Sequence, residues 1–153
     1  MQRSANDVGE ALDSLNAQRS LLVGNSCAGQ ILTLFASQHS DRLSGLVYLD
    51  GASDPTTPAY GPTGIRVPVL AIYQAQLPFE EVAKEFDIRN EEECAALRQY
   101  YAATRAMYTR WPQHLLAAIP MARIVELPGA NLYMFLSNEA DTIRELRAFA
   151  STL

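Results

Sequence analysis

The chain has 153 residues, of which 48% are hydrophobic and 19% are charged, so it is long and apolar enough to bury the core of one globular domain. The net charge is −5 and the basic residues are scattered, which argues against nucleic acid or an anionic membrane surface as a partner. Two cysteines are too few for a disulfide scaffold, and no apolar run has the length of a membrane span or the form of a signal peptide. We therefore expect a cytoplasmic protein.

The first third of the chain predicts a helix, a strand and a second helix. Apolar residues recur at helical spacing over residues 4–19, which indicates an amphipathic helix. Residues 20–29 then have the pattern of a short buried strand that stops, turns and restarts as a helix running to about residue 38. Ser26 lies at the turn between Gly24 and Ala28, and such a sharp turn requires small neighbours. Ser26 is thus a candidate nucleophile position, although a serine that only caps a helix would look similar.

Two further buried strands are predicted, separated by a loop. Residues 46–49 form a continuous apolar run, as in a parallel strand covered on both faces, and Asp50 follows it. Residues 52–64 have the composition of a loop and include Asp54. Residues 67–73 indicate the next strand.

Residues 78–120 are compatible with helix almost throughout. We expect one helix over residues 79–86 and another that starts after Asn90, the predicted cap. Four aromatic residues in this segment either line a pocket or, more commonly, pack between helices: Tyr100, Tyr101, Tyr108 and Trp111.

The last third repeats the alternation of strand and helix. A strand is predicted over residues 123–127, a loop over residues 128–137, and a final helix capped by Asn138. Strands that alternate with helices pair in parallel through right-handed crossovers. The sequence therefore predicts an α/β fold with about four parallel strands and flanking helices.

Four segments in this order resemble the C-terminal part of the α/β-hydrolase fold. They are residues 21–29 (Leu-Leu-Val-Gly-Asn-Ser-Cys-Ala-Gly), 41–50, 67–73 and 127–133 (Leu-Pro-Gly-Ala-Asn-Leu-Tyr). The resemblance implies that residues 1–153 form a single hydrolase-like domain, truncated at its N-terminus. In that reading residues 78–120 are a helical, lid-like insertion.

The resemblance also assigns roles to residues of the site. Ser26 takes the position of the nucleophile, and the backbone N–H of Cys27 takes that of an oxyanion-hole donor. Asp50 corresponds to the acid, with Asp54 as the alternative. Relatives with this loop carry histidine, the general base, at the position of Leu132.

The missing base and the short front part of the chain both predict impaired catalysis. His39 and His114 fall outside the loop after the last strand, and neither is expected to replace the base. The family normally places several strands before the elbow, including the loop that gives the second oxyanion-hole donor, and here only some twenty residues precede it. A Cys27 thiol nucleophile would equally lack a histidine to activate it.

Two functions remain open from the sequence. One is a serine hydrolase lineage, esterase-like and acting on small carbonyl esters, that is impaired or inactive as this chain. The other is a non-catalytic module that binds an ester-like ligand or associates with itself, because the strand before Ser26 would expose an unpaired sheet edge. We expect a homo-oligomer through that edge, and no cofactor or metal, since no metal-ligand spacing or phosphate loop occurs.

Overall fold

The computed structural model describes residues 1–51 and 64–153. Its elements in chain order are α1 (Gln2–Ser14), β1 (Ser20–Asn25), α2 (Ala28–Gln38), the 3-10 turn η1 (Ser40–Arg42), β2 (Leu43–Leu49), β3 (Val69–Gln74), α3 (Phe79–Ala83), α4 (Glu91–Ala118), β4 (Arg123–Leu127), α5 (Met134–Ser137) and α6 (Glu139–Ala150). The predicted alternation of strands and helices is confirmed.

The four strands form one parallel sheet in the order β1-β2-β3-β4. The central strands β2 and β3 are buried along almost their whole length, which explains why they lack polar alternation. Because all strands point the same way, their carboxyl ends share one edge of the sheet. Ligand and catalytic sites of open α/β sheets lie at this edge.

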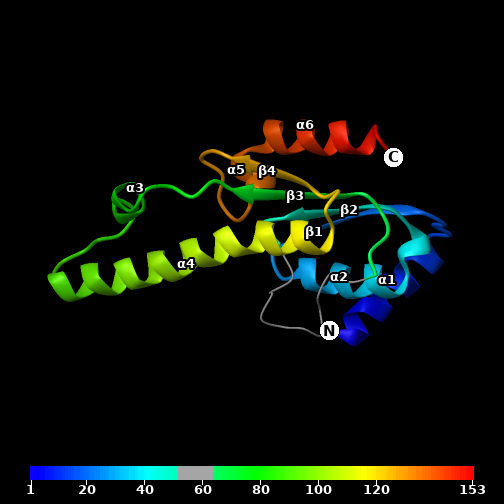
Figure 1. Cartoon of the computed structure of the whole chain (residues 1–153), viewed down its shortest axis with the longest axis horizontal. Coiled ribbons are helices and arrows are strands. Elements are labelled where there is room, and N and C mark those ends of the chain that lie inside the picture. The colour runs from blue at the N-terminus through cyan, green and yellow to red at the C-terminus, as the bar shows by residue number, and fades with distance from the viewer. Residues whose placement is uncertain (52–63) are drawn as a thin grey trace.

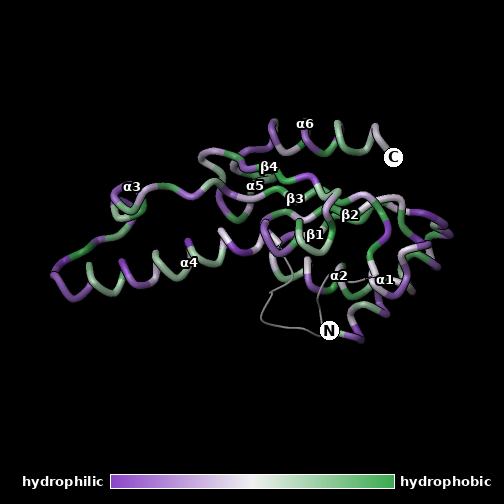
Figure 2. The backbone as a smooth tube through the Cα atoms, in the orientation of Figure 1, coloured by the Kyte–Doolittle hydropathy of each residue, from purple (hydrophilic) through white to green (hydrophobic). Residues whose placement is uncertain are grey.

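Helices cover both faces of the sheet (Figure 1). On one face, α1, α2 and the C-terminal part of α4 pack around a core that includes Leu12, Phe35 and Leu115. On the other face, α5 and α6 cover a smaller core that includes Leu70 and Phe149. The strands are among the most hydrophobic segments of the chain (Figure 2), as expected for a sheet that is enclosed by helices.

Helix α3 and the N-terminal half of α4 project from the sheet as an arm (Figure 1). The rings of Phe79 and Tyr101 meet edge to face at 5.5 Å, and the Arg98 guanidinium lies 4.1 Å from the centre of the Phe79 ring. The predicted cap of α4 is confirmed, since Asn90 Oδ1 accepts a hydrogen bond from the Glu93 N–H at 2.9 Å. Residues 78–120 are thus mainly helical.

Several predictions are corrected by the structure, among them the helix expected over residues 79–86, which ends at Ala83. The first helix ends at Ser14 rather than residue 19, because Asn16 takes a left-handed conformation with φ of 51° and the Ala17 N–H bonds to the carbonyl of Leu12. The loop predicted over residues 128–137 contains the short helix α5. The Asn138 side chain makes no cap and donates instead to the carbonyl of Pro128.

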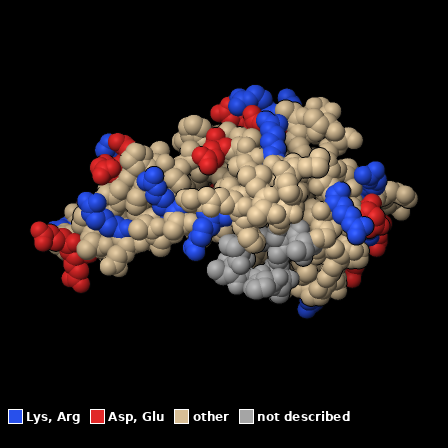
Figure 3. Space-filling view, in the orientation of Figure 1, with Lys and Arg blue, Asp and Glu red and all other residues tan. Residues whose placement is uncertain are grey.

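Charged side chains gather over the arm, over α6 and at the end of the molecule opposite the arm. The centre of the face in Figure 3 carries few of them. None of the helices in the described ranges is both long and apolar enough to cross a membrane. Within residues 1–51 and 64–153, no group of His, Cys, Asp and Glu side chains is placed to hold a metal ion.

Candidate active site at the carboxyl edge of the sheet

Ser26 lies at the apex of a sharp turn between β1 and α2. Its backbone has a φ of 53°, a left-handed conformation that is uncommon for a residue with a side chain. The Ser26 N–H donates to the Leu49 carbonyl at 3.0 Å, and the Ser26 carbonyl accepts from the Gly29 N–H at 2.9 Å. The turn therefore has both the strain and the fixed backbone that a nucleophile elbow requires.

Glycines allow the backbone of residues 50–51 to pack directly against this turn. A Cβ atom on Gly51 would lie 2.7 Å from the Ser26 carbonyl oxygen, and one on Gly29 would lie 3.2 Å from the Cα of Gly51. Before the turn, a Cβ on Gly24 would meet the Leu32 side chain at 2.6 Å. The small residues around Ser26 are thus required by close packing of the elbow, as the sequence predicted.

The Asn25 side chain joins three parts of the site that are distant in sequence. Its Nδ2 donates to the Leu49 carbonyl at 2.8 Å and to the Leu132 carbonyl at 2.9 Å. Asn25 precedes Ser26, the predicted nucleophile, and Leu49 precedes Asp50, the predicted acid. The Asn25 amide therefore connects the backbone next to these two positions with Leu132, the predicted position of the base. Sequence reasoning missed Asn25, although a polar residue at the end of a buried strand was the available signal.

Asp50 is the buried carboxyl group of the site, with 2% of its surface exposed. It follows β2 in a left-handed conformation with φ of 47°. Its Oδ2 accepts from Tyr108 Oη at 2.7 Å and from Gln74 Nε2 at 2.9 Å, and its Oδ1 accepts from the Gln74 N–H at 3.3 Å. Burial raises the pKa of Asp50, while these hydrogen bonds act in the opposite direction. The carboxylate therefore faces β3 and α4, and Asp54 lies outside the described residues.

Comparison with solved structures identifies the architecture. The chain aligns over 99% of its length with 60% of a predicted CIB-like hydrolase from Thermoplasma acidophilum, with a TM-score of 0.67 and 15% identity. It aligns over 95% of its length with 73% of Est816, an N-acyl homoserine lactone degrading enzyme, with a TM-score of 0.63 and 15% identity. The chain has an α/β-hydrolase fold. No protein-family model matches the sequence, and no curated protein matches it either.

In this hydrolase fold, Cys27 stands between the elbow and helix α2. Its side chain is exposed, and its backbone is already helical. Within the described part of the chain, the Cys27 N–H has no backbone acceptor, whereas the N–H groups of Gly29 and Gln30 donate to the carbonyls of Ser26 and Cys27. The oxyanion-hole role of the Cys27 N–H stays a prediction.

Neither histidine lies on the loop that carries Leu132. His39 follows the C-terminal end of α2, whose 11 residues separate it from Ser26 by about 16 Å at 1.5 Å per residue. Its ring packs on Phe35 with centroids 5.0 Å apart. His114 lies six residues beyond Tyr108, on the part of α4 that runs towards the start of β4. Leu132 is half-buried, its carbonyl binds the Asn25 side chain, and its place as that of the missing base stays a prediction.

The predicted aromatic cluster divides between two environments. Tyr108 packs against Trp111 with ring centroids 5.3 Å apart and reaches Asp50, whereas Tyr101 belongs to the arm and Tyr100 is 64% exposed. A cavity of about 470 Å³ lies beside Tyr108, between α4 and the ends of β3 and β4. Its lining comprises Tyr73, Gln74, Ala75, Gln76, Arg105, Tyr108, Thr109, Pro112, Gln113 and Glu126.

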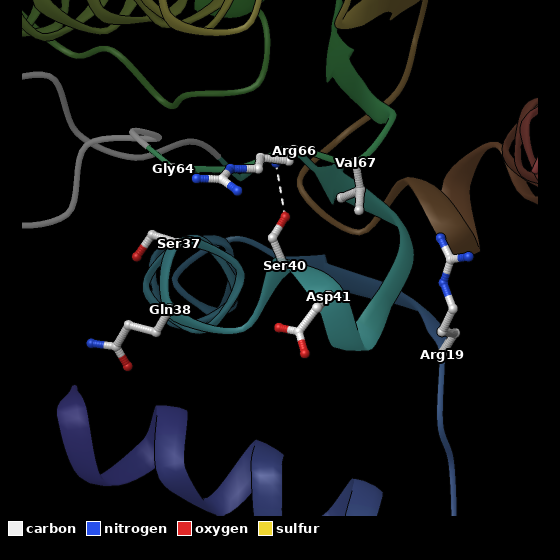
Figure 4. Close-up of a pocket in the computed structure, with 8 residues that line it drawn as sticks. All are labelled: Arg19, Ser37, Gln38, Ser40, Asp41, Gly64, Arg66 and Val67. Carbon is white, nitrogen blue, oxygen red and sulfur yellow. Dashed lines mark hydrogen bonds between the residues drawn. The ribbon is translucent and has the colours of Figure 1, made fainter.

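A second cavity, of about 530 Å³, lies at the opposite edge of the sheet (Figure 4). Its lining includes Arg19, Asp41 and Arg66 from the segments that precede β1, β2 and β3. The Arg66 N–H donates to Ser40 Oγ at 2.8 Å across one side of it. Because this cavity is at the amino ends of the strands, it is separate from the elbow and Asp50.

Proposed function

We propose that this chain is a serine-hydrolase-type protein, esterase-like by descent, that accepts small carbonyl esters at Ser26 but turns them over poorly. The observation that carries the proposal is the left-handed Ser26 between β1 and α2, preceded by Asn25, whose side chain binds the Leu132 carbonyl. The two similar structures support the same class of chemistry, since one is described as a hydrolase and the other as a lactone-degrading enzyme.

The impairment follows from the chemistry of residue 132. A serine hydroxyl is a poor nucleophile unless a base takes its proton during attack, and a leucine side chain has no lone pair to accept it. Loss of a triad member leaves about 10³- to 10⁴-fold catalysis over water, which comes from the oxyanion hole and binding. Turnover by the parent chain is therefore expected to remain near that residual level.

Hydrolysis of a p-nitrophenyl ester tests this function directly. We expect no rapid burst from the parent chain, and slow labelling of Ser26 by a phosphonate probe that Ser26→Ala abolishes. Leu132→His should raise Ser26-dependent hydrolysis by up to about 10²-fold, the lower end of what a general base supplies. A rapid burst from the parent chain that Ser26→Ala removes would contradict the impairment.

Leu136→His is the matched control for this experiment. Leu136 lies on α5, four residues after Leu132, and is 75% exposed, so an imidazole there gains no fixed position beside Ser26. Like Leu132→His, this variant adds one histidine, but at a neighbouring surface position. Equal gains from the two variants would show that the effect is not specific to position 132, and the proposal would then fail.

A second candidate function is self-association through β1. Among the described strands β1 pairs only with β2, and Val23 on this edge is 46% exposed. The strand Ser20–Asn25 contains no charged residue, and charges are a common protection of open edges. We propose that two copies pair antiparallel along β1, where no like charges would oppose each other.

Light scattering at high concentration tests this pairing. The parent chain is expected to show the mass of a dimer, and Val23→Lys that of a monomer, because a lysine at the centre of the strand would face its own copy across the two-fold axis. Tyr100→Lys, on the exposed surface of α4, should leave the dimer intact. A monomeric parent chain would rule out the pairing.

A further inference from the structure

Three side chains form a closed polar cluster at the junction of β2, β3 and α4, and we call Asp50, Gln74 and Tyr108 the Asp50 cluster. Both close hydrogen bonds of the carboxylate fall on Oδ2, from Tyr108 Oη at 2.7 Å and Gln74 Nε2 at 2.9 Å. Gln74 Nε2 also donates to the Tyr108 hydroxyl oxygen. Every member of the cluster therefore contacts the other two.

Among the described residues, no donor to the Asp50 carboxylate comes from the loop that carries Leu132. The acid of a triad accepts a hydrogen bond from the imidazole and stabilises its cation. Here the strongest donors to Asp50 come from α4, 58 positions along the chain, and from the end of β3. A hydrogen bond to a charged group is stronger than one between neutral groups. The Tyr108 hydroxyl therefore competes with an imidazole for the Asp50 carboxylate.

The competition matters because one side chain connects the loop of Leu132 to the end of β2. The Asn25 amide binds the Leu132 carbonyl and also the carbonyl of Leu49, the residue that precedes Asp50. An imidazole at position 132 would thus stand near the carboxylate, provided that the carboxylate can turn away from α4. From the residues that the structure describes, Oδ2 accepts two hydrogen bonds, whereas Oδ1 accepts one, from the Gln74 N–H at 3.3 Å.

We propose that Tyr108 is a positioning residue. Its hydroxyl group holds the Asp50 carboxylate against helix α4, so that the carboxylate is not free to bind a base at position 132. The inference rests on the proposed function, because it assigns a second restraint on the same site besides the missing imidazole. It also gives α4 a role at the site, because a hydroxyl group of this helix binds the residue at the acid position.

An NMR titration of the introduced imidazole tests the proposal without relying on activity. The two proteins are Leu132→His and the double variant Leu132→His/Tyr108→Phe, with His39 and His114 as internal references. We expect the pKa of the new imidazole to be about one unit higher in the double variant, because a released carboxylate favours the imidazolium form. Equal pKa values in the two proteins would overturn the proposal.

Two control variants make the result specific. Leu132→His/Tyr101→Phe removes a hydroxyl from the same helix that bonds to the Leu77 carbonyl rather than to Asp50, so it should leave the imidazole pKa unchanged. Adding Asp50→Asn to the double variant should return the pKa to the value of Leu132→His alone. If Tyr108→Phe does not fold, Tyr108→Leu removes the same hydroxyl and provides the same comparison.

Ester hydrolysis separates this inference from the proposed function. The double variant should hydrolyse a p-nitrophenyl ester about tenfold or more faster than Leu132→His, in line with the strength of a hydrogen bond to a charged group. A higher imidazole pKa with no reaction at Ser26 would sustain the inference and reject the function. Reaction at Ser26 with equal imidazole pKa values in the two variants would sustain the proposed function and reject the inference about Tyr108.

Discussion

The variant Gly51→Ala is expected to lose about 3 kcal/mol of unfolding free energy, the upper part of the range for overpacking a tight site. Its new Cβ would lie 2.7 Å from the Ser26 carbonyl oxygen and 3.2 Å from the Ser26 nitrogen. Both contacts are with backbone, which cannot turn away as a flexible side chain could. The elbow must therefore shift, and the Ser26–Leu49 hydrogen bond would be strained first. Chemical denaturation measures the loss.

Gly9→Ala provides the matched control for this prediction. Gly9 lies inside α1, and its Cβ would meet the Phe35 ring at 3.5 Å, an ordinary van der Waals distance. Alanine in a helix interior is favoured over glycine by about 0.5–1 kcal/mol, so this variant should be slightly more stable than the parent. If Gly51→Ala were as stable as Gly9→Ala, the close packing of residue 51 against the elbow would be refuted.

Sequence predicted the sheet well because its strands obey a simple rule. Parallel strands enclosed by helices are apolar on both faces. The strand predicted over residues 46–49 starts three residues earlier in the structure, and the one predicted over residues 123–127 has the observed bounds. The elbow was equally clear, since only small residues fit around Ser26. The predicted end of the first helix was wrong because the helix expected over residues 4–19 ran through Asn16, and asparagine also enters the left-handed conformation that stops a helix.

The surroundings of Asp50 could not have been predicted in the same way. The sequence placed this residue at the end of a strand, which was correct, but its partners depend on how α4 crosses the sheet. Tyr108 was one of four aromatic residues in the predicted helical segment, and nothing in the local sequence marked it as the one that reaches the carboxylate. Periodicity gives the face of a helix, whereas the angle at which the helix packs is set by contacts across the whole core.

The loop that carries Leu132 is expected to loosen in the variant Asn25→Ala, with a loss of about 2 kcal/mol of unfolding free energy. The Asn25 amide supplies two hydrogen bonds to backbone carbonyls, and a typical net contribution is about 1 kcal/mol for each. The Leu49 carbonyl keeps the Ser26 N–H as a donor, so the effect should fall mainly on Leu132. Faster amide hydrogen exchange in residues 129–133 is the measurement.

Asn131→Ala is the matched control, because it removes a hydrogen bond within the loop and leaves the hydrogen bond between Asn25 and Leu132 in place. Asn131 Oδ1 accepts from the Tyr133 N–H at 2.8 Å, a contact within the loop that does not reach β1. Its loss should speed exchange at Tyr133 while leaving the response of Leu132→His in ester hydrolysis unchanged. Asn25→Ala, in contrast, should cancel that response, because an imidazole on a loop released from β1 no longer has a fixed place beside Ser26. Equal responses in the two backgrounds would mean that Asn25 does not align the site.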